Sequence, residues 1–172
     1  ATGGHVESTV KIAQAGLPIV YAIIGGNPHY FKKLIQAYRE IGRDAGHADK
    51  DLKVGAHSWG WIAEDGEQAV KDYFHPTKQV VDAISKDRPH WQELTYEQYL
   101  EQVGPNGAMF VGNPDQVAEK LIRMIEDLDL DRFMLHLPLG SMPHDQVLRA
   151  IELFGTQVAP KVRAYFAMKE GL

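Results

Sequence analysis

The chain has 172 residues, of which 44% are hydrophobic and 24% charged, a composition typical of a globular domain with a sizeable core. Its formal net charge of −5 argues against a nucleic-acid partner, because binding phosphates needs clustered Lys and Arg. Cysteine is absent, which excludes disulfides and thiolate metal sites and suits a cytoplasmic protein. No apolar run approaches the length of a transmembrane helix, so no membrane partner is expected.

The first nine residues are typical of the turn between a strand and a helix. Gly3 and Gly4 let the backbone approach a ligand closely, and Ser8 and Thr9 follow where a helix begins. Hydroxyls and free N–H groups at a helix N-terminus can hold an anion such as phosphate, although an ordinary helix cap is the alternative. Because a domain rarely starts at such a turn, we expect the chain to be the later part of a larger α/β protein.

The rest of the sequence alternates between apolar runs and amphipathic segments. Buried strands are predicted at residues 18–24, 52–61 and 131–139. Helices are predicted over residues 28–45, 68–84, 116–128 and 146–168. The stretch 85–106 departs from this rhythm and predicts an insertion or lid with a short helix near its end, followed by a short apolar piece at 107–111.

Buried strands that alternate with helices imply parallel pairing through right-handed crossovers. Three such strands alone would leave two sheet edges and much apolar surface open. We therefore predict a single α/β domain over residues 1–172, a partial TIM (β/α)8 barrel with roughly the last three strands and their helices. Since open edges and apolar faces promote association, a homo-oligomer is expected.

Several segments resemble the luciferase-like flavin-dependent monooxygenases, in the order and spacing found in that family. They are Gly3–Ser8, Ala15–Pro18, Ile24–Pro28, Val111–Leu121, Asp131–Leu135, Ile151–Gly155 and Val158–Arg163. Val111–Leu121 resembles the family's helix start G-x-P-x-x-V-A-x-K-[LI]. The resemblance covers nearly the whole chain and implies the C-terminal half of the family's barrel, beginning just after its fifth strand.

The resemblance also implies a cofactor and a chemistry. Members of the family bind FMN, or a deazaflavin in some branches, and use reduced flavin with molecular oxygen to oxidise a small organic substrate. By this resemblance Gly3, Gly4, His5 and Ser8 would hold the cofactor phosphate. A flavin reductase that supplies reduced cofactor is compatible with this scheme. Because the flavin carries out the redox step, no protein nucleophile is required.

Two histidines on predicted strands are the candidates for groups that face substrate. His57, with Ser58 beside it, lies on the second predicted strand, and His136 lies on the third. A histidine on a mostly apolar strand is more often a satisfied core residue, and that alternative stays open. Trp59 and Trp61 are expected to pack against the outer helices. Gly25 and Gly26 directly follow the first predicted strand, so we expect this pair at the barrel mouth. There it would form a tight turn or bring the backbone close to a ligand.

Two other functions remain open. One is a non-catalytic half-barrel fragment, because much of the flavin-ring pocket would lie in the absent half, and the isolated chain is then expected to be weak or inactive. The other is a metal-dependent barrel hydrolase with His57, His136 and a carboxylate as ligands. Against the hydrolase, no His-x-His pair occurs and the predicted strands lack inward carboxylates, so no metal is expected.

Overall fold

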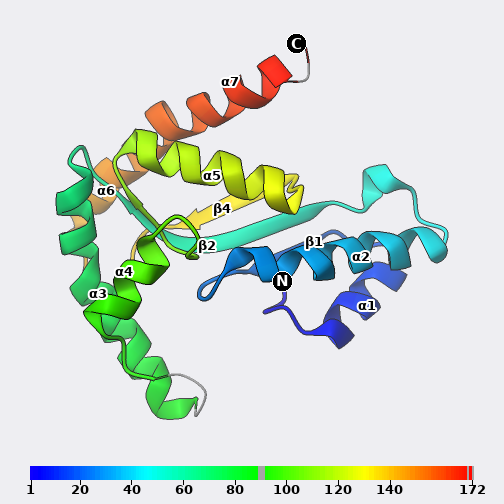
Figure 1. Ribbon diagram of the computed structural model, residues 1–172, viewed down its shortest axis with the longest axis horizontal. Helices are drawn as coiled ribbons and strands as arrows, with labels where there is room; N and C mark the ends of the chain where they lie inside the picture. Colours follow the sequence, from blue (N-terminus) through cyan, green and yellow to red (C-terminus); the bar gives the residue numbers. More distant parts are fainter. Residues whose placement is uncertain (89–91, 170, 172) are drawn as a thin grey trace.

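The computed structural model describes residues 1–88, 92–169 and 171. In this part of the chain one sheet holds four strands, and every pair in it is parallel (Figure 1). The strands are β1 (Ile19–Ala22), β2 (Val54–Ile62), β3 (Phe110–Gly112) and β4 (Arg132–His136). β2 is the central strand, because β1 and β4 pair with its first part and β3 pairs with its last three residues.

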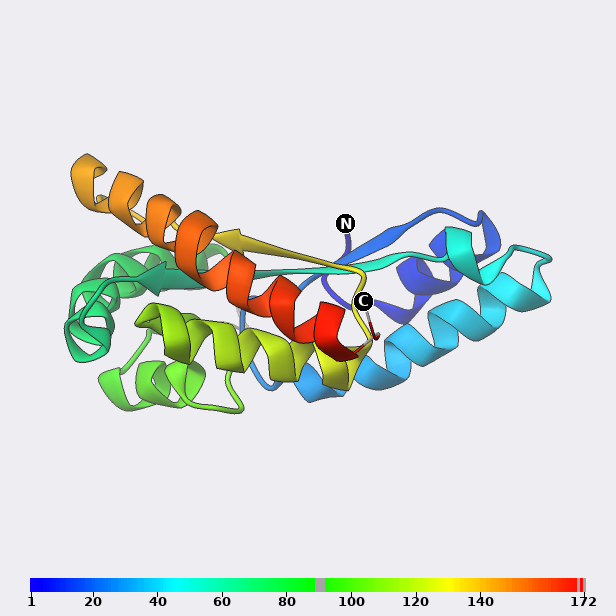
Figure 2. The ribbon, with the colours of Figure 1, turned by 90° about the horizontal axis from the view of Figure 1, so that it is seen from above.

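Helices and short helical turns connect the strands. They are α1 (Val6–Gln14), η1 (Pro28–Phe31), α2 (Lys32–Asp44), η2 (Asp49–Asp51), α3 (Gly66–Asp87), α4 (Tyr96–Val103), α5 (Pro114–Leu128), α6 (His144–Leu153), the π turn η3 (Phe154–Val158) and α7 (Ala159–Lys169). In Figure 1, α1 and α2 lie at one end of the molecule and α3 and α4 at the other. α7 packs on α5 (Figure 2).

The observed elements follow the predicted order, with three differences. The apolar piece at 107–111 contributes β3, because its last residues pair with the end of β2. The last predicted helix is interrupted by the π turn η3. The expected insertion is mostly helical, since α3 extends to Asp87 and α4 fills the later part, while residues 89–91 of that insertion lie outside the described residues.

The two faces of the sheet differ in burial. Tyr21, Ala56 and Leu135 belong to the face that packs against helices, and α2 and α5 lie on that side (Figure 2). On β4 burial alternates along the strand, so that Met134 is 38% exposed while its neighbours on either side pack on the core. The first predicted strand was expected to be buried on both faces, but Val20 is only half-buried. The second face of the sheet is therefore more open, and it carries polar as well as apolar side chains.

A buried lysine fastens the expected insertion to the rest of the domain. Lys120 on α5 is 8% exposed, and burial lowers the pKa of its amine to about 7. Its Nζ donates to the backbone carbonyls of Val103, Gly104 and Met109 at 3.0, 2.6 and 2.6 Å. The C-terminus of α4 and the segment that enters β3 are thus held by one side chain, which supplies donors that helix carbonyls otherwise lack.

We predict that Lys120→Met destabilises the fold. The substitution keeps much of the side-chain volume but leaves buried carbonyl groups without a donor, which costs about 2–4 kcal/mol of unfolding free energy. Urea unfolding followed by circular dichroism measures the change. Lys33→Met, at an exposed position of α2, is the matched control and should have little effect. Equal stabilities of the two variants would show that the Lys120 amine does not anchor α4.

Candidate functional site

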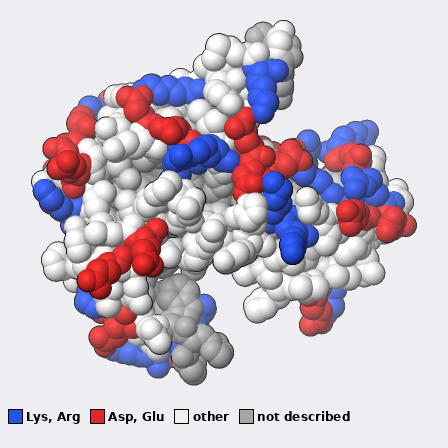
Figure 3. All heavy atoms as spheres, in the orientation of Figure 1, with Lys and Arg blue, Asp and Glu red and all other residues white. Residues whose placement is uncertain are grey.

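A hollow of about 600 Å³ lies at the C-terminal ends of β1 and β2. We call it the mouth hollow, and its lining residues are Gly3, Ala22, Ile24, Gly25, Gly26, Phe31, Trp59, Val81, Gln92, Leu94, Gln98, Glu101, Gln102 and Met109. Figure 3 shows this face hollowed between the part that carries α3 and α4 and the part that carries α1 and α2, with mostly uncharged atoms around the hollow. The ends of parallel strands are where α/β barrels place their sites.

The N-terminal turn is held against β1 at the edge of this hollow. The Thr2 N–H donates to the Val20 carbonyl at 2.8 Å, and the Thr2 carbonyl accepts from the Ala22 N–H at 2.9 Å. Thr2 thus forms a parallel bridge beside β1, as a strand residue would. Gly4 has a φ of +94°, and a Cβ built there would lie 2.8 Å from the Phe31 ring, so both conformation and space favour glycine.

The helix that follows this turn has no side-chain cap. α1 begins at Val6, earlier than the sequence suggested, so Ser8 is its third residue and is partly exposed. His5 occupies the N-cap position, its side chain makes no capping bond, and it is exposed. Thr9 is buried and its hydroxyl donates to the His5 carbonyl at 3.1 Å. The ordinary cap by Ser8 or Thr9 is therefore not formed, and the first-turn amides lack partners within the helix.

The two candidate histidines lie together on the open face of the sheet. The ring centres of His57 and His136 are 5.6 Å apart, with 32° between the ring planes. Burial and the neighbouring His136 lower the pKa of His57, so its neutral form is favoured at pH 7. Ser58 does not accompany them, because its buried hydroxyl donates to the Ile23 carbonyl at 2.9 Å on the other face.

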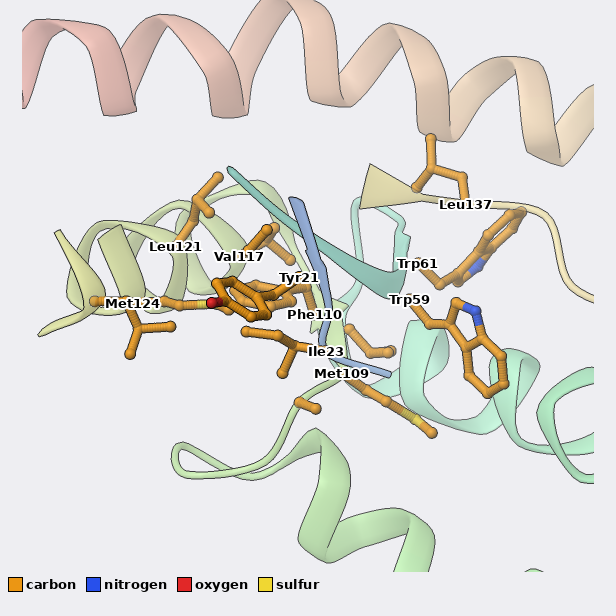
Figure 4. Close-up of a cluster of buried hydrophobic side chains, with 14 of the residues drawn as sticks. Tyr21, Ile23, Trp59, Trp61, Met109, Phe110, Val117, Leu121, Met124 and Leu137 are labelled. Carbon is orange, nitrogen blue, oxygen red and sulfur yellow. The ribbon is translucent and has the colours of Figure 1, made fainter. Parts of the chain in front are cut away.

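The two tryptophans of β2 have different surroundings. Trp61 stacks on Tyr73 of α3 with ring centres 5.9 Å apart, as expected for packing against an outer helix. Trp59 is buried in the core and also lines the mouth hollow, together with Val81 of α3. Its indole lies apart from the cluster around Phe110 and Val117 (Figure 4). Trp59 pairs in register with His136 and so shares the face that carries the histidines, although neither histidine lines the hollow.

The turn after β1 serves two of the expected purposes at once. Asn27 Oδ1 accepts from the His29 N–H at 2.9 Å, and Pro28 starts η1, so Gly25-Gly26 form a tight turn into a capped helix. Both glycines also line the mouth hollow. They therefore bring backbone, without side chains, to the rim of the hollow.

One functional candidate was not foreseen from the sequence. Gln102 of α4 lines the mouth hollow, and its side-chain Oε1 is buried without a hydrogen-bond partner. The sequence pattern of α4 carries no signal for this, because the orientation of the helix depends on the anchor at Lys120. Because this oxygen has no exposed surface, it is other atoms of Gln102 that border the hollow.

Two features are absent from the described part of the chain, a cluster of His, Asp and Glu metal ligands and a membrane-spanning helix. Residues 1–88, 92–169 and 171 contain no group of three or more His, Asp or Glu that could hold a metal ion. The metal-dependent hydrolase therefore has no ligand set among these residues. Within the same residues, no helix has the length and hydropathy needed to cross a membrane.

Similarity to known proteins appears in structure and not in sequence. No family model and no curated protein matches the chain. A monooxygenase from Streptomyces bottropensis is 18% identical over 92% of this chain and 46% of its own, with a TM-score of 0.75. The oxygenating constituent of the 3,6-diketocamphane monooxygenase of Pseudomonas putida, solved with FMN, is 18% identical over 90% and 45%, with a TM-score of 0.60.

A third solved structure extends the comparison to deazaflavin enzymes. The coenzyme F420-dependent tetrahydromethanopterin reductase of Methanopyrus kandleri is 17% identical over 91% of this chain and 48% of its own, with a TM-score of 0.61. The chain has the luciferase-like fold. It spans about half the length of these structures, which confirms the predicted fold class, a partial (β/α)8 barrel.

Proposed function

We propose that this chain is the cofactor-phosphate and substrate-facing half of a flavin-dependent monooxygenase. The observation that carries the proposal is the uncapped first turn of α1, which follows the turn at Gly3 and Gly4, and Gly3 lines the mouth hollow. Backbone N–H groups without an acceptor in the helix, together with the positive end of the helix dipole, favour binding of a phosphate. The fold shared with an enzyme solved with FMN and with an F420-dependent enzyme supports a flavin as the ligand.

The residues of the turn fit a flavin phosphate in four ways. Gly3 leaves open space at the rim, and Gly4 packs the backbone against Phe31. The side chains of His5 and Ser8 are accessible beside the first-turn amides and can donate to phosphate oxygens. FMN is the cofactor proposed, with a deazaflavin as the alternative. Reduced FMN, when bound, supplies the electrons with which molecular oxygen is activated.

The open face of the sheet is proposed to meet substrate. His57 and His136 would donate or accept hydrogen bonds there, and the neutral form of His57 provides both a donor and an acceptor. Trp59 would cover the reacting region and exclude water. Since the chain spans about half the length of the solved structures that it resembles, the isolated chain is expected to show weak activity or none, and a non-catalytic fragment remains the alternative.

We predict that the phosphate, rather than the flavin ring alone, drives binding to the isolated chain. FMN should bind saturably in a fluorescence titration, and riboflavin, which lacks the phosphate, should bind at least tenfold more weakly. Replacing both His5 and Ser8 by Ala should remove this preference, which corresponds to a loss of about 1.4 kcal/mol or more of FMN binding free energy. The matched control is Ser85→Ala on α3, where the hydroxyl of Ser85 donates to the Asp82 carbonyl.

Two results would contradict the proposal. Equal affinities for FMN and riboflavin would show that the turn does not hold a phosphate. Failure of FMN and of a deazaflavin cofactor to bind at all would leave the fold assignment intact but remove the cofactor assignment.

We also propose that the chain associates with itself through the open edge of the sheet at β4, which among the described residues pairs with β2 alone. Met134 of β4 is 38% exposed at this edge, in register with His57 of β2. Sedimentation at tens of micromolar should show a dimer or larger species, which Met134→Lys weakens by placing a charge at the edge. Met168→Lys, at a 73% exposed position of α7, should leave association unchanged. A monomeric wild-type chain would contradict this proposal.

A further inference from the structure

Three side chains that can bind a soft metal ion meet on the open face of the sheet. They are His57 of β2 and Met134 and His136 of β4. Met134 pairs in register with His57, and His136 pairs with Trp59, two residues further along β2. Side chains two residues apart on a strand share a face, and neighbouring strands lie about 4.8 Å apart. The three side chains therefore stand side by side on one surface.

The two imidazole rings have the separation of rings that share one metal ion. Their centres are 5.6 Å apart. A metal–nitrogen bond of about 2.0 Å puts each ring centre about 3 Å from the ion, so two rings on one ion have centres about 5–6 Å apart. Neither ring has a hydrogen-bond partner among the described residues, whereas His29 and His47 each have one. The ring nitrogens are therefore available to a ligand.

Access to this face is open enough for an ion to enter. His136 is exposed, Met134 is 38% exposed and His57 is half-buried. The thioether and both rings can thus be reached from solvent without a change in the strands that carry them.

The donor set determines which ion fits. Imidazole binds several transition metals, but a thioether selects for copper(I). In residues 1–88, 92–169 and 171 no carboxylate joins the two histidines in a group of metal ligands, so the oxygens that Mg²⁺ and Ca²⁺ require are missing. Zinc favours four ligands, usually with thiolate or carboxylate among them. Two imidazoles and a thioether, all neutral, suit a soft monovalent ion with few ligands.

We propose that His57, Met134 and His136 form a binding site for a copper(I) ion. The inference goes beyond the proposed function, because neither the flavin nor the turn before α1 takes part in it. Bound copper would keep a substrate from the two rings. The sequence alone did not predict a metal here, because Met134 is placed beside His57 only by the register between β2 and β4.

Equilibrium dialysis under anaerobic conditions tests the site. The chain is dialysed against copper(I) kept reduced by ascorbate, at protein concentrations below those at which it associates, and the bound metal is measured by atomic absorption. Parallel samples receive Zn²⁺ or Mg²⁺. We expect one copper(I) ion per chain, bound at least tenfold more tightly than Zn²⁺, because only copper(I) gains from the thioether.

Three variants assign the binding to its ligands. His57→Gln and His136→Gln should each weaken copper(I) at least tenfold. Met134→Leu should weaken copper(I) about tenfold and leave Zn²⁺ unchanged, since zinc would use the imidazoles alone. A general change in packing would weaken both ions, so this difference separates a ligand from a structural residue. His75→Gln, at an exposed position of α3, is the matched control.

A second readout uses the unaltered chain. Copper(I) is diamagnetic, so the ring C–H signals of the histidines stay visible by NMR, and those of His57 and His136 should shift while that of His75 does not. Absence of copper(I) binding, tighter binding of Zn²⁺ than of copper(I), or unchanged copper(I) affinity in Met134→Leu would each overturn the proposal. None of these results depends on whether FMN binds.

Discussion

Every strand of the sheet pairs with β2, and the rest of the structure depends on that single strand. Its nine residues accept β1 and β4 along the first part and β3 along the last part. At its start, Asp131 fixes the register of β4, since its carboxylate accepts from the Val54 N–H at 2.9 Å and from Lys53 Nζ at 2.8 Å. Burial would raise the pKa of Asp131, but these bonds lower it, which keeps the carboxylate charged and the register fixed.

The candidate site is a consequence of this arrangement. Because β2 is extended, alternate residues lie on opposite faces, so that Ser58 serves the core while His57 and Trp59 share the open face. The parallel pairing then brings His136 beside His57 and places the turn after β1 at the same end as Trp59. The N-terminal turn joins them through the bridge of Thr2 to β1. Residues far apart in the sequence are thus gathered at one end of the sheet.

Much of the fold could be predicted because its signals are local. Apolar runs, the capping residue Asn113 and the proline after it mark β2, β4 and α5 directly in the sequence. β3 was missed as a strand because three residues carry too little pattern, and its pairing depends on β2 extending past β1 and β4. The π turn η3 has no periodic signal of its own.

Candidate residues that lie close together in the sequence could be predicted, whereas those that depend on packing between distant segments could not. The glycines and Ser8 lie within six residues of one another in the sequence, so they could be proposed together as candidates. The proximity of His57 and His136 follows from parallel pairing, but their distance depends on register. The sequence carries no signal for Lys120 or Gln102, because a lysine and a glutamine in amphipathic helices are ordinarily solvated. The burial of the Lys120 side chain and of the Gln102 side-chain oxygen results from the way α4 packs against the segment around Lys120.

The central claim is that the uncapped turn before α1 is the place where a cofactor phosphate binds. Hydrogen–deuterium exchange with and without FMN tests it most directly, since a bound phosphate would protect the amides that the helix itself leaves free. The account predicts slowed exchange in a peptide covering residues 3–9 and little change in α7. Protection that is absent from this peptide, or that appears elsewhere in the chain, would contradict it.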